Sequence, residues 1–198
     1  MADKETLAVY AERAADYSNR FAKSGEGRHL TTFLAELPAG GRILDFGCGP
    51  GHTAAAMKRA GFEVDALDAS PELAEIAKSQ FGIDVLVATF DSLEATDQYD
   101  GIFANFSLLH IPKSQMPSNL ARIARALVSR GVLHIGLKRG TGEMRDTIGR
   151  FYAYYSLEEI TNLLTQAGFQ VIRKTEGEQA GLDGTVAPWL ILLARKHD

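Results

Sequence analysis

The segment Ile43–Gly51 (ILDFGCGPG) combines an acid with three alternate glycines, residue types that can hold a small molecule against bare backbone. Glycine adopts backbone angles that other residues avoid, and its missing side chain lets N–H groups approach a ligand closely. Asp45 stands two residues before Gly47. Its carboxylate would repel a pyrophosphate in a low-dielectric site and would suit a ligand that carries an ammonium group. The segment therefore predicts the nucleotide-binding corner of an α/β fold, suited to a ligand that bears an ammonium group.

The spacing of these glycines differs from a dinucleotide fingerprint. The GxGxxG pattern needs a third glycine for close helix packing beside a bound pyrophosphate. Aligning Gly47 and Gly49 with its first two glycines places His52 at the third position. The spacing and Asp45 argue against NAD, although Asp68 at the end of the next apolar run suits an adenosine ribose. A nicotinamide-dependent oxidoreductase remains an alternative.

Apolar runs and helix-forming segments alternate along the chain. A helix over 53–60 follows the glycine turn, and a further helix over 156–168 begins with a capping box of Ser156 and Glu159. The expected strands are 43–46, 62–68, 84–90, the run starting at Tyr99, 132–138, and two strands within 169–196 around the turn at 181–184. This alternation predicts an α/β fold with its ligand at the carboxyl ends of the strands.

The combined pattern resembles class I S-adenosylmethionine-dependent methyltransferases of the small-molecule type. The resemblance is carried by ILDFGCGPG, by acids at Asp68 and Asp91 after two further strands, by YDGIFANFSLLH from Tyr99, and by the YSLEEI helix. It implies a Rossmann-like, seven-stranded, mostly parallel sheet whose last strand is antiparallel, with helices on both faces. It also implies one domain over 1–198, made of an N-terminal helical cap or lid (1–37) and a Rossmann-like core (38–198).

The resemblance also implies a cofactor site for S-adenosylmethionine, whose product is S-adenosylhomocysteine. Asp45 would lie near the methionyl end, Asp68 would hold the ribose hydroxyls, and Asp91 would contact the adenine amino group with Phe90 or Ser92 beside the ring. The other residues that the motifs assign to this site are Gly47, Cys48, Gly49, Pro50, Gly51, Ala69, Ser70, Asn105, Tyr17 and Arg20.

The N-terminal segment carries Tyr10, Tyr17, Arg20 and Phe21. It reads as two helices interrupted near Gly25–Gly27, and it resembles a segment that folds over the cofactor in relatives and would exclude water. The alternative is that these helical aromatic residues pack against the core.

Methyl transfer needs few catalytic side chains, because the sulfonium cofactor is already an activated electrophile. His110, just after the fourth strand, is the candidate general base, since its usual pKa lies near neutrality. A structural hydrogen bond is the alternative role. His52 is expected at the helix N-terminus beside the cofactor, and Cys48 is expected to matter for its small size. No metal site is expected.

The acceptor is expected to be a small molecule. Asn105-Phe106-Ser107-Leu108 departs from the (D/N)PP(Y/F) box of adenine and glutamine methylases. Residues 138–152 follow the fifth strand, where relatives place substrate-binding residues. The candidates for contact with the acceptor are Tyr10, Arg139, Arg150 and Tyr154. Alternatively, the arginines are solvated charges on a loop and the tyrosines only pack against neighbouring residues.

The composition fits one enzyme domain. The chain has 198 residues, 45% of them hydrophobic, one cysteine and a formal charge of −4. The single cysteine excludes an internal disulfide and suits a reducing cytoplasm, and the charge argues against nucleic acid as a partner. No signal peptide or membrane-length apolar stretch is found, so we expect a cytoplasmic monomer or homodimer without membrane contact. A non-catalytic regulatory protein that binds the same cofactor remains a second alternative.

Overall fold

The computed structural model describes residues 3–21 and 27–198. A seven-stranded sheet with the order β3-β2-β1-β4-β5-β9-β8 forms its centre. Its neighbours β1, β2, β3, β4 and β5 pair in parallel, and β9 is antiparallel to both β5 and β8. The expected seven-stranded Rossmann-like sheet with an antiparallel last strand is confirmed.

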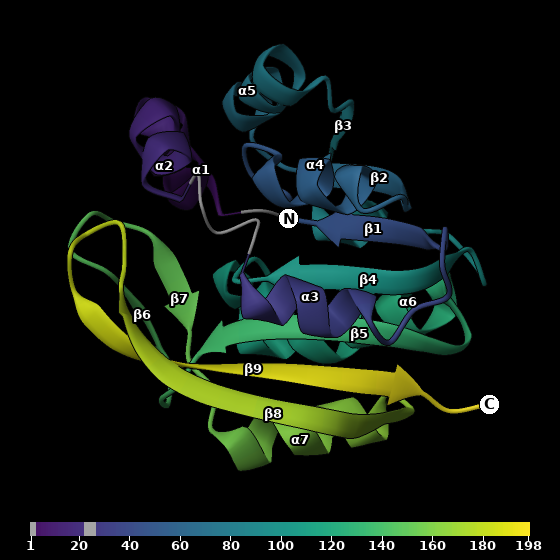
Figure 1. The fold of residues 1–198 in the computed structure, drawn as a ribbon. Coiled ribbons are helices and arrows are strands. Elements are labelled where there is room, and N and C mark those ends of the chain that lie inside the picture. The colour runs from purple at the N-terminus through teal and green to yellow at the C-terminus, as the bar shows by residue number, and fades with distance from the viewer. Residues whose placement is uncertain (1–2, 22–26) are drawn as a thin grey trace.

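The elements alternate along the chain as the sequence predicts (Figure 1). The strands are β1 (Arg42–Phe46), β2 (Glu63–Asp68), β3 (Val85–Val87), β4 (Tyr99–Asn105), β5 (Leu127–Lys138), β6 (Glu143–Arg145), β7 (Phe151–Ala153), β8 (Phe169–Ala180) and β9 (Val186–Lys196). The helices are α1 (Lys4–Glu12), α2 (Ala14–Phe21), α3 (Arg28–Leu34), α4 (His52–Arg59), α5 (Pro71–Phe81), α6 (Met116–Ala126) and α7 (Leu157–Gln166), with short 3-10 turns η2 (Phe90–Ser92), η3 (Leu108–His110) and η4 (Lys113–Gln115).

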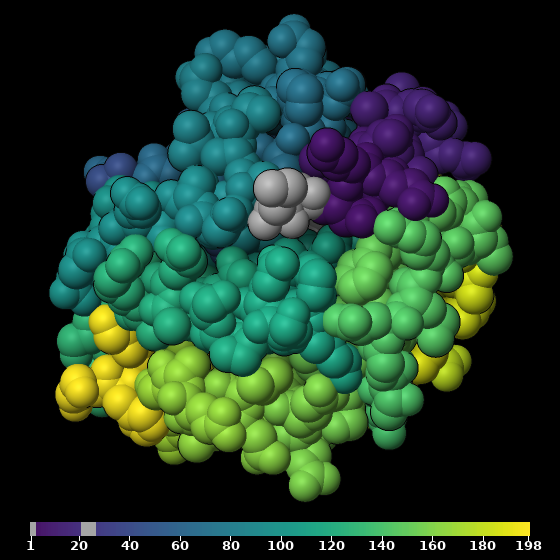
Figure 2. Space-filling view, turned by 180° about the vertical axis from the view of Figure 1, so that it is seen from behind, coloured from purple at the N-terminus to yellow at the C-terminus, as the bar shows by residue number. Residues whose placement is uncertain are grey.

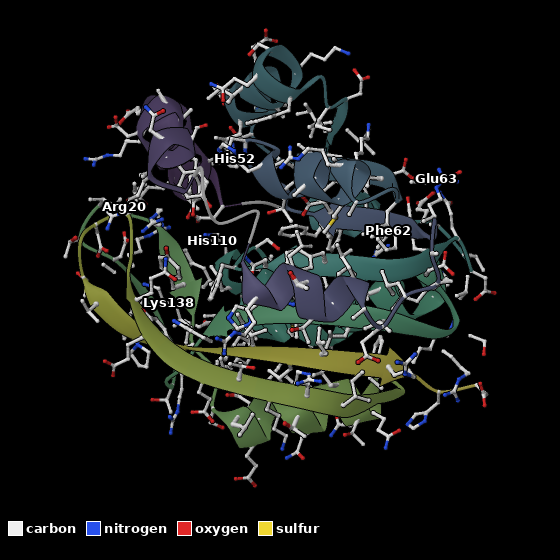
Figure 3. All side chains as sticks on the ribbon, viewed as in Figure 1. Arg20, His52, Phe62, Glu63, His110 and Lys138 are labelled. Carbon is white, nitrogen blue, oxygen red and sulfur yellow. The ribbon has the colours of Figure 1, made fainter. Side chains whose placement is uncertain are left out.

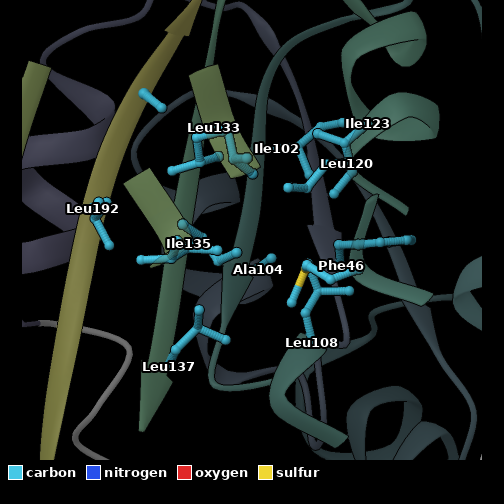
Figure 4. Packing of buried hydrophobic residues seen from close by; sticks show 14 of the residues in the cluster. Phe46, Ile102, Ala104, Leu108, Leu120, Ile123, Leu133, Ile135, Leu137 and Leu192 are labelled. Atoms are coloured by element: carbon cyan, nitrogen blue, oxygen red, sulfur yellow. The ribbon is translucent and has the colours of Figure 1, made fainter. Parts of the chain in front are cut away.

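Both faces of the sheet are buried because successive side chains of a strand point to opposite faces. Ile43 packs in one hydrophobic cluster with Phe33 of α3 and Met57 of α4. The next residue, Leu44, belongs to a larger cluster on the other face. Figure 4 shows that larger cluster, in which Leu120 and Ile123 of α6 meet the sheet. Helices therefore cover both faces, as expected.

The structure differs from the sequence expectations in the ends of two strands and in one additional hairpin. The expected third strand shortens to β3, and residues 90–92 form the turn η2 instead. The strand expected over 132–138 starts earlier, because β5 begins at Leu127 directly after α6 ends at Ala126. The small hairpin of β6 and β7, within the segment after β5, was not expected. Three-residue strands give too little periodicity to be recognised.

The N-terminal segment also differs from the two expected helices. A break at Arg13 separates α1 from α2, and α3 follows as a third helix. The interruption expected near Gly25–Gly27 falls mostly on residues outside the described ones. Among the described residues, no helix is long and apolar enough to cross a membrane.

The helices α1 and α2 lie over the carboxyl end of the sheet, where Figure 2 shows them against the green segment that carries β6 and β7. The hairpin of β8 and β9 extends beyond the sheet and curves toward them (Figure 1). Arg20 of α2 bridges the gap, because its Nη1 donates to the Leu182 carbonyl at 3.4 Å. The carboxyl end of the sheet is thus enclosed by segments far apart in the sequence.

Candidate functional site

The glycine turn after β1 needs residues without a side chain. Gly47, Gly49 and Gly51 all have positive φ angles, of 83°, 54° and 82°. A Cβ on Gly47 would lie 2.3 Å from the Cβ of Ser107, whose hydroxyl donates to the Phe46 carbonyl at 2.6 Å. A Cβ on Gly51 would lie 2.8 Å from the Cβ of Ala77 on α5. Gly47 therefore lets β1 approach β4, and Gly51 lets α4 approach α5.

Two adjoining cavities open at this turn. The larger cavity, of about 370 Å³, extends to the tip of β9, and the smaller cavity, of about 100 Å³, extends over the ends of β2 and β3. Residues that line both are Tyr10, Tyr17, Gly47, Gly49, Asn105 and Phe106. The two cavities therefore meet between the glycine turn and the tyrosines of α1 and α2.

Asp45 lies on the wall of the larger cavity and is only 3% exposed. It accepts a hydrogen bond from the Ala54 backbone, and its Oδ2 has no partner among the described residues. Burial, with a smaller contribution from nearby Asp68, raises the Asp45 pKa to about 8. An unsatisfied buried carboxyl oxygen is costly, so this atom suits a ligand that brings a cationic donor.

Asp68, the last residue of β2, lines the smaller cavity. Its Oδ2 accepts from the Gly49 N–H at 2.7 Å, and its Oδ1 accepts from the Ser70 N–H at 2.9 Å. Burial raises its pKa although these backbone donors oppose the shift. Ala69 and Ser70 line the same cavity, and Ser70 also caps α5. The carboxylate is fixed by backbone while each oxygen keeps accepting capacity for a hydroxyl.

The far end of the smaller cavity is formed by η2. Phe90 lines it, with its ring 4.7 Å from that of Phe46. Asp91 lines it as well, and the hydroxyl of Thr89 donates to its carboxylate, which lowers the Asp91 pKa. Ser92 instead donates to the Thr89 carbonyl and is not among the described residues that line a cavity. A flat apolar ring beside an ionised acid suits a purine base with an exocyclic amine.

A chain of hydrogen bonds connects α1 to the segment after β5. The Tyr10 hydroxyl donates to His110 Nε2 at 2.9 Å, and it accepts from Arg150 Nη1 at 3.1 Å. His110 Nδ1 lies 2.7 Å from the Phe151 carbonyl, which can only accept, so Nδ1 carries the proton. Burial lowers the His110 pKa to about 4. At neutral pH, His110 is therefore a neutral imidazole whose free nitrogen accepts from Tyr10.

The family of the chain follows from its similarity to a known family model. The family model described as a methyltransferase domain matches residues 18–174, which is most of the chain. The chain belongs to the methyltransferase domain family.

Individual relatives of this methyltransferase domain align over part of their length. The ubiquinone biosynthesis O-methyltransferase of Xanthomonas axonopodis pv. citri is 33% identical over 101 residues, or 48% of this chain and 41% of the relative. The protein of the same description from Xanthomonas oryzae pv. oryzae is 33% identical over 100 residues, or 47% of this chain and 41% of the relative. The chain thus spans less than half the length of these relatives.

Solved structures share the fold of the domain. The 1,6-didemethyltoxoflavin-N1-methyltransferase of Burkholderia thailandensis, solved with 1,6-didemethyltoxoflavin and S-adenosylhomocysteine, superposes with a TM-score of 0.80 at 22% identity, covering 98% of this chain and 88% of that one. A TehB-like methyltransferase of Corynebacterium glutamicum gives 0.70 at 21% identity, covering 96% and 98%. These likenesses agree with the Rossmann-like sheet described above.

Other residues singled out in the sequence take varied positions in the methyltransferase domain. Cys48 and Pro50 line the larger cavity, and burial raises the pKa of the Cys48 thiol, so it is no nucleophile at neutral pH. His52 begins α4 and also lines this cavity, with its Nε2 at 3.0 Å from the Ser18 carbonyl of α2. The place of His52 at the start of α4 agrees with the sequence expectation, and the roles of both residues beside a cofactor stay predictions.

Three basic or aromatic candidates lie apart from the cavities, whose described lining does not include them. Arg20 is exposed and reaches the β8–β9 turn. Arg139 is exposed and pairs with Glu176 at 2.6 Å. Tyr154 packs over Gly140. By contrast, Arg150 and Tyr10 do line the larger cavity.

Sequence reasoning missed three residues of the site. Lys138 and Trp189 line the larger cavity, and His134 lies buried behind Asn105 and donates to its Oδ1 at 3.0 Å. Burial lowers the His134 pKa to about 3, so the ring stays neutral. Lys138 ends β5 at the same edge as Asp45 and Asp68, a position that could have marked it. Trp189 carried no such signal.

Proposed function

We propose that this chain is an S-adenosylmethionine-dependent methyltransferase that acts on a small-molecule acceptor. The observation that carries the proposal is the buried Asp45 carboxyl beside the glycine turn, whose Oδ2 has no hydrogen-bond partner in the described part of the chain. The relatives and solved structures that are named as methyltransferases support the same activity. S-adenosylmethionine, when bound, supplies an activated methyl group on a sulfonium.

The residues of the two cavities match the parts of that cofactor. Asp45 would pair with the ammonium group, Asp68 would accept from the ribose hydroxyls, and Phe90 with Asp91 would hold the adenine. Tyr10 and Tyr17 stand where the cavities meet, with their rings 5.1 Å apart. Aromatic faces stabilise a neighbouring cation, so this is where we place the sulfonium.

The part of the larger cavity away from Asp45 would then hold the acceptor, with its nucleophilic atom in line with the methyl carbon. Positioning of that kind supplies much of the rate enhancement in transfers from an activated donor. The helices α1 and α2 exclude water from the junction of the cavities. We propose His110 as a positioning residue for Tyr10, because its low pKa and its occupied Nε2 make it a poor proton acceptor.

We further propose that residues 1–198 act as one unit, with residues 1–37 capping the core of 38–198. We place the protein in the cytoplasm, as a monomer or homodimer, with no nucleic-acid or membrane partner. The single cysteine and the net charge of −4 support this assignment.

Calorimetry with S-adenosylhomocysteine and with NAD tests the cofactor. We expect binding of S-adenosylhomocysteine only, and tight NAD binding without a response to S-adenosylhomocysteine would instead favour an oxidoreductase. Transfer of labelled methyl groups from the cofactor into a metabolite extract tests turnover. Cofactor binding with no labelled product in any extract would favour a regulatory protein.

A further inference from the structure

Lys138 and Trp189 project side by side into the larger cavity. They are cross-strand partners in the antiparallel pair of β5 and β9, so their side chains lie on the same face of the sheet. Arg139, one residue later, points to the other side and pairs with Glu176 there. Figure 3 shows Lys138 at the end of the sheet that faces α1 and α2, on the same side as His110.

Gly177 of β8 lies next to Trp189 across the sheet and fixes the position of its indole ring. It is the register partner of Trp189, and a Cβ at Gly177 would lie 2.4 Å from Cζ2 of the indole. The Trp189 ring therefore rests on bare backbone. His29 and Phe106 meet it edge to face, at centroid distances of 5.5 and 6.4 Å. The indole is held as a rigid wall of the cavity.

The ammonium of Lys138 has no anionic partner within residues 3–21 and 27–198, where it makes neither an ion pair nor a hydrogen bond. Its Nζ lies 4.4 Å from the centre of the Tyr152 ring. Burial lowers its pKa, and the attraction of Asp183, which makes no ion pair with it, opposes this shift without cancelling it.

The other cation on this wall is already neutralised. Arg150 makes a bidentate pair with Asp146, at 2.9 and 2.7 Å, and both side chains are almost fully buried. Its guanidinium also donates to the Tyr10 hydroxyl and lies over the rings of Tyr10 and Tyr152. Asp183 is occupied by the backbone and hydroxyl donors of Thr185 and Thr147. Lys138 is thus the cation on this wall that is left to meet a ligand.

Aromatic and apolar side chains make up much of the wall around Lys138. Phe103, Phe106, Tyr152, Trp189, Leu182 and Ile191 line the cavity around Lys138. Rigid aromatic walls of this kind favour flat ligands that stack or meet them edge to face. A cation beside them adds a strong directional contact for an anionic oxygen.

Building on the proposed function, we infer that the methyl acceptor is a flat aromatic acid whose carboxylate pairs with Lys138 while its ring lies against Trp189. The carboxylate would replace the missing partner of the ammonium, and the aromatic walls would bury the ring. The acceptor atom would then face Tyr10 and Asn105, where the two cavities meet.

Matched acids and amides test this inference on the full chain. The probes are benzoate and 2-naphthoate, each compared with its neutral amide of nearly equal shape. Affinity is measured by calorimetry, and benzoate is also followed through quenching of Trp189, the only tryptophan of the chain. We expect the better acid to bind at least roughly tenfold more tightly than its amide and to quench Trp189.

Substitutions assign the preference to Lys138. Lys138→Met keeps the length of the side chain and should abolish the acid preference, whereas Lys138→Arg should keep most of it. Arg139→Met removes the same charge one residue later, on the outer side, and should leave the preference unchanged. Equal binding of acids and amides, no binding of either acid, or an acid preference that survives in Lys138→Met would each overturn the inference.

Failure of this inference is separable from failure of the proposed function. Binding of S-adenosylhomocysteine is measured in the same preparations. Retained cofactor binding without a preference for acids would contradict only the proposal of an aromatic acid as acceptor. Absence of cofactor binding would contradict the proposed function, whatever the acid and amide probes show.

Discussion

The Tyr10 hydroxyl donates to His110 Nε2 at 2.9 Å across 100 residues of sequence, and this bond ties α1 to the turn η3 that follows β4. Because the His110 pKa falls to about 4 through burial, the pair carries no charge at neutral pH. It holds the phenol at the junction of the two cavities.

His110→Phe and His110→Gln separate positioning from proton transfer. Phe removes the acceptor for Tyr10 and should lower turnover about tenfold, the scale of one lost hydrogen bond. Gln keeps an accepting oxygen and should restore most of that loss. In the unsubstituted chain, protonation of His110 should not lower turnover at any pH above about 5. Equal losses in both variants, with an acid limb near neutrality, would make His110 the general base.

Cofactor binding should release a proton from Asp45. Its pKa of about 8 in the ligand-free protein leaves it largely protonated at neutral pH, and an ammonium partner would lower that pKa again. Calorimetry of S-adenosylhomocysteine in buffers of different ionisation enthalpy at pH 7 should show a release approaching about one proton. Affinity should rise with pH up to about 8. Asp45→Asn should abolish the release, and an unchanged release in that variant would contradict the assignment.

The same pKa affects stability in the absence of ligand. An unfolded aspartate ionises near pH 4, so between about pH 4 and pH 8 the folded chain binds more protons than the unfolded chain. The contribution of Asp45 to stability is therefore greatest below pH 4 and declines as the pH rises through this window. Denaturant unfolding of the chain and of Asp45→Asn across this range measures it. The variant should show a flatter dependence on pH.

Asp68→Ala should weaken the binding of S-adenosylhomocysteine by about 1–3 kcal/mol, because it removes the charged acceptor proposed for the ribose hydroxyls. It also frees the Gly49 N–H, which Asp68 now holds. Calorimetry on a variant whose folding is checked by circular dichroism measures the loss. Unchanged affinity in a folded variant would remove Asp68 from the site.

Gly47→Ala should destabilise the fold through close packing as well as backbone strain. Its φ of 83° and the 2.3 Å approach to Ser107 both oppose a Cβ. Gly61, with a φ of 91° and open space around it, is the matched control. We expect Gly61→Ala to cost about 1–2 kcal/mol and Gly47→Ala about 1–3 kcal/mol more. Urea unfolding gives both values, and equal costs would show that Ser107 can move aside.

The sequence determined the order of the elements and the acids at the strand ends. Periodicity of apolar residues marks strands and helices locally, and parallel strands bring their carboxyl ends to one edge. For this reason the amino-acid sequence alone was enough to place Asp45, Asp68 and Asp91 at the carboxyl edge of the sheet. The capping box of Ser156 was also readable, and the Ser156 hydroxyl accepts from the Glu159 N–H at 3.0 Å.

The tertiary structure decided which side chains are available for chemistry. Arg139 and Arg150 look alike in the sequence, but strand alternation turns Arg139 outward, and Asp146 neutralises Arg150 in the interior. Among the described residues, Lys138 makes no ion pair, because its cross-strand neighbour is Trp189 and not an acid. The pairing of Lys138 with Trp189 joins residues about fifty positions apart, and burial in the folded chain sets the pKa values, so local sequence patterns contain neither.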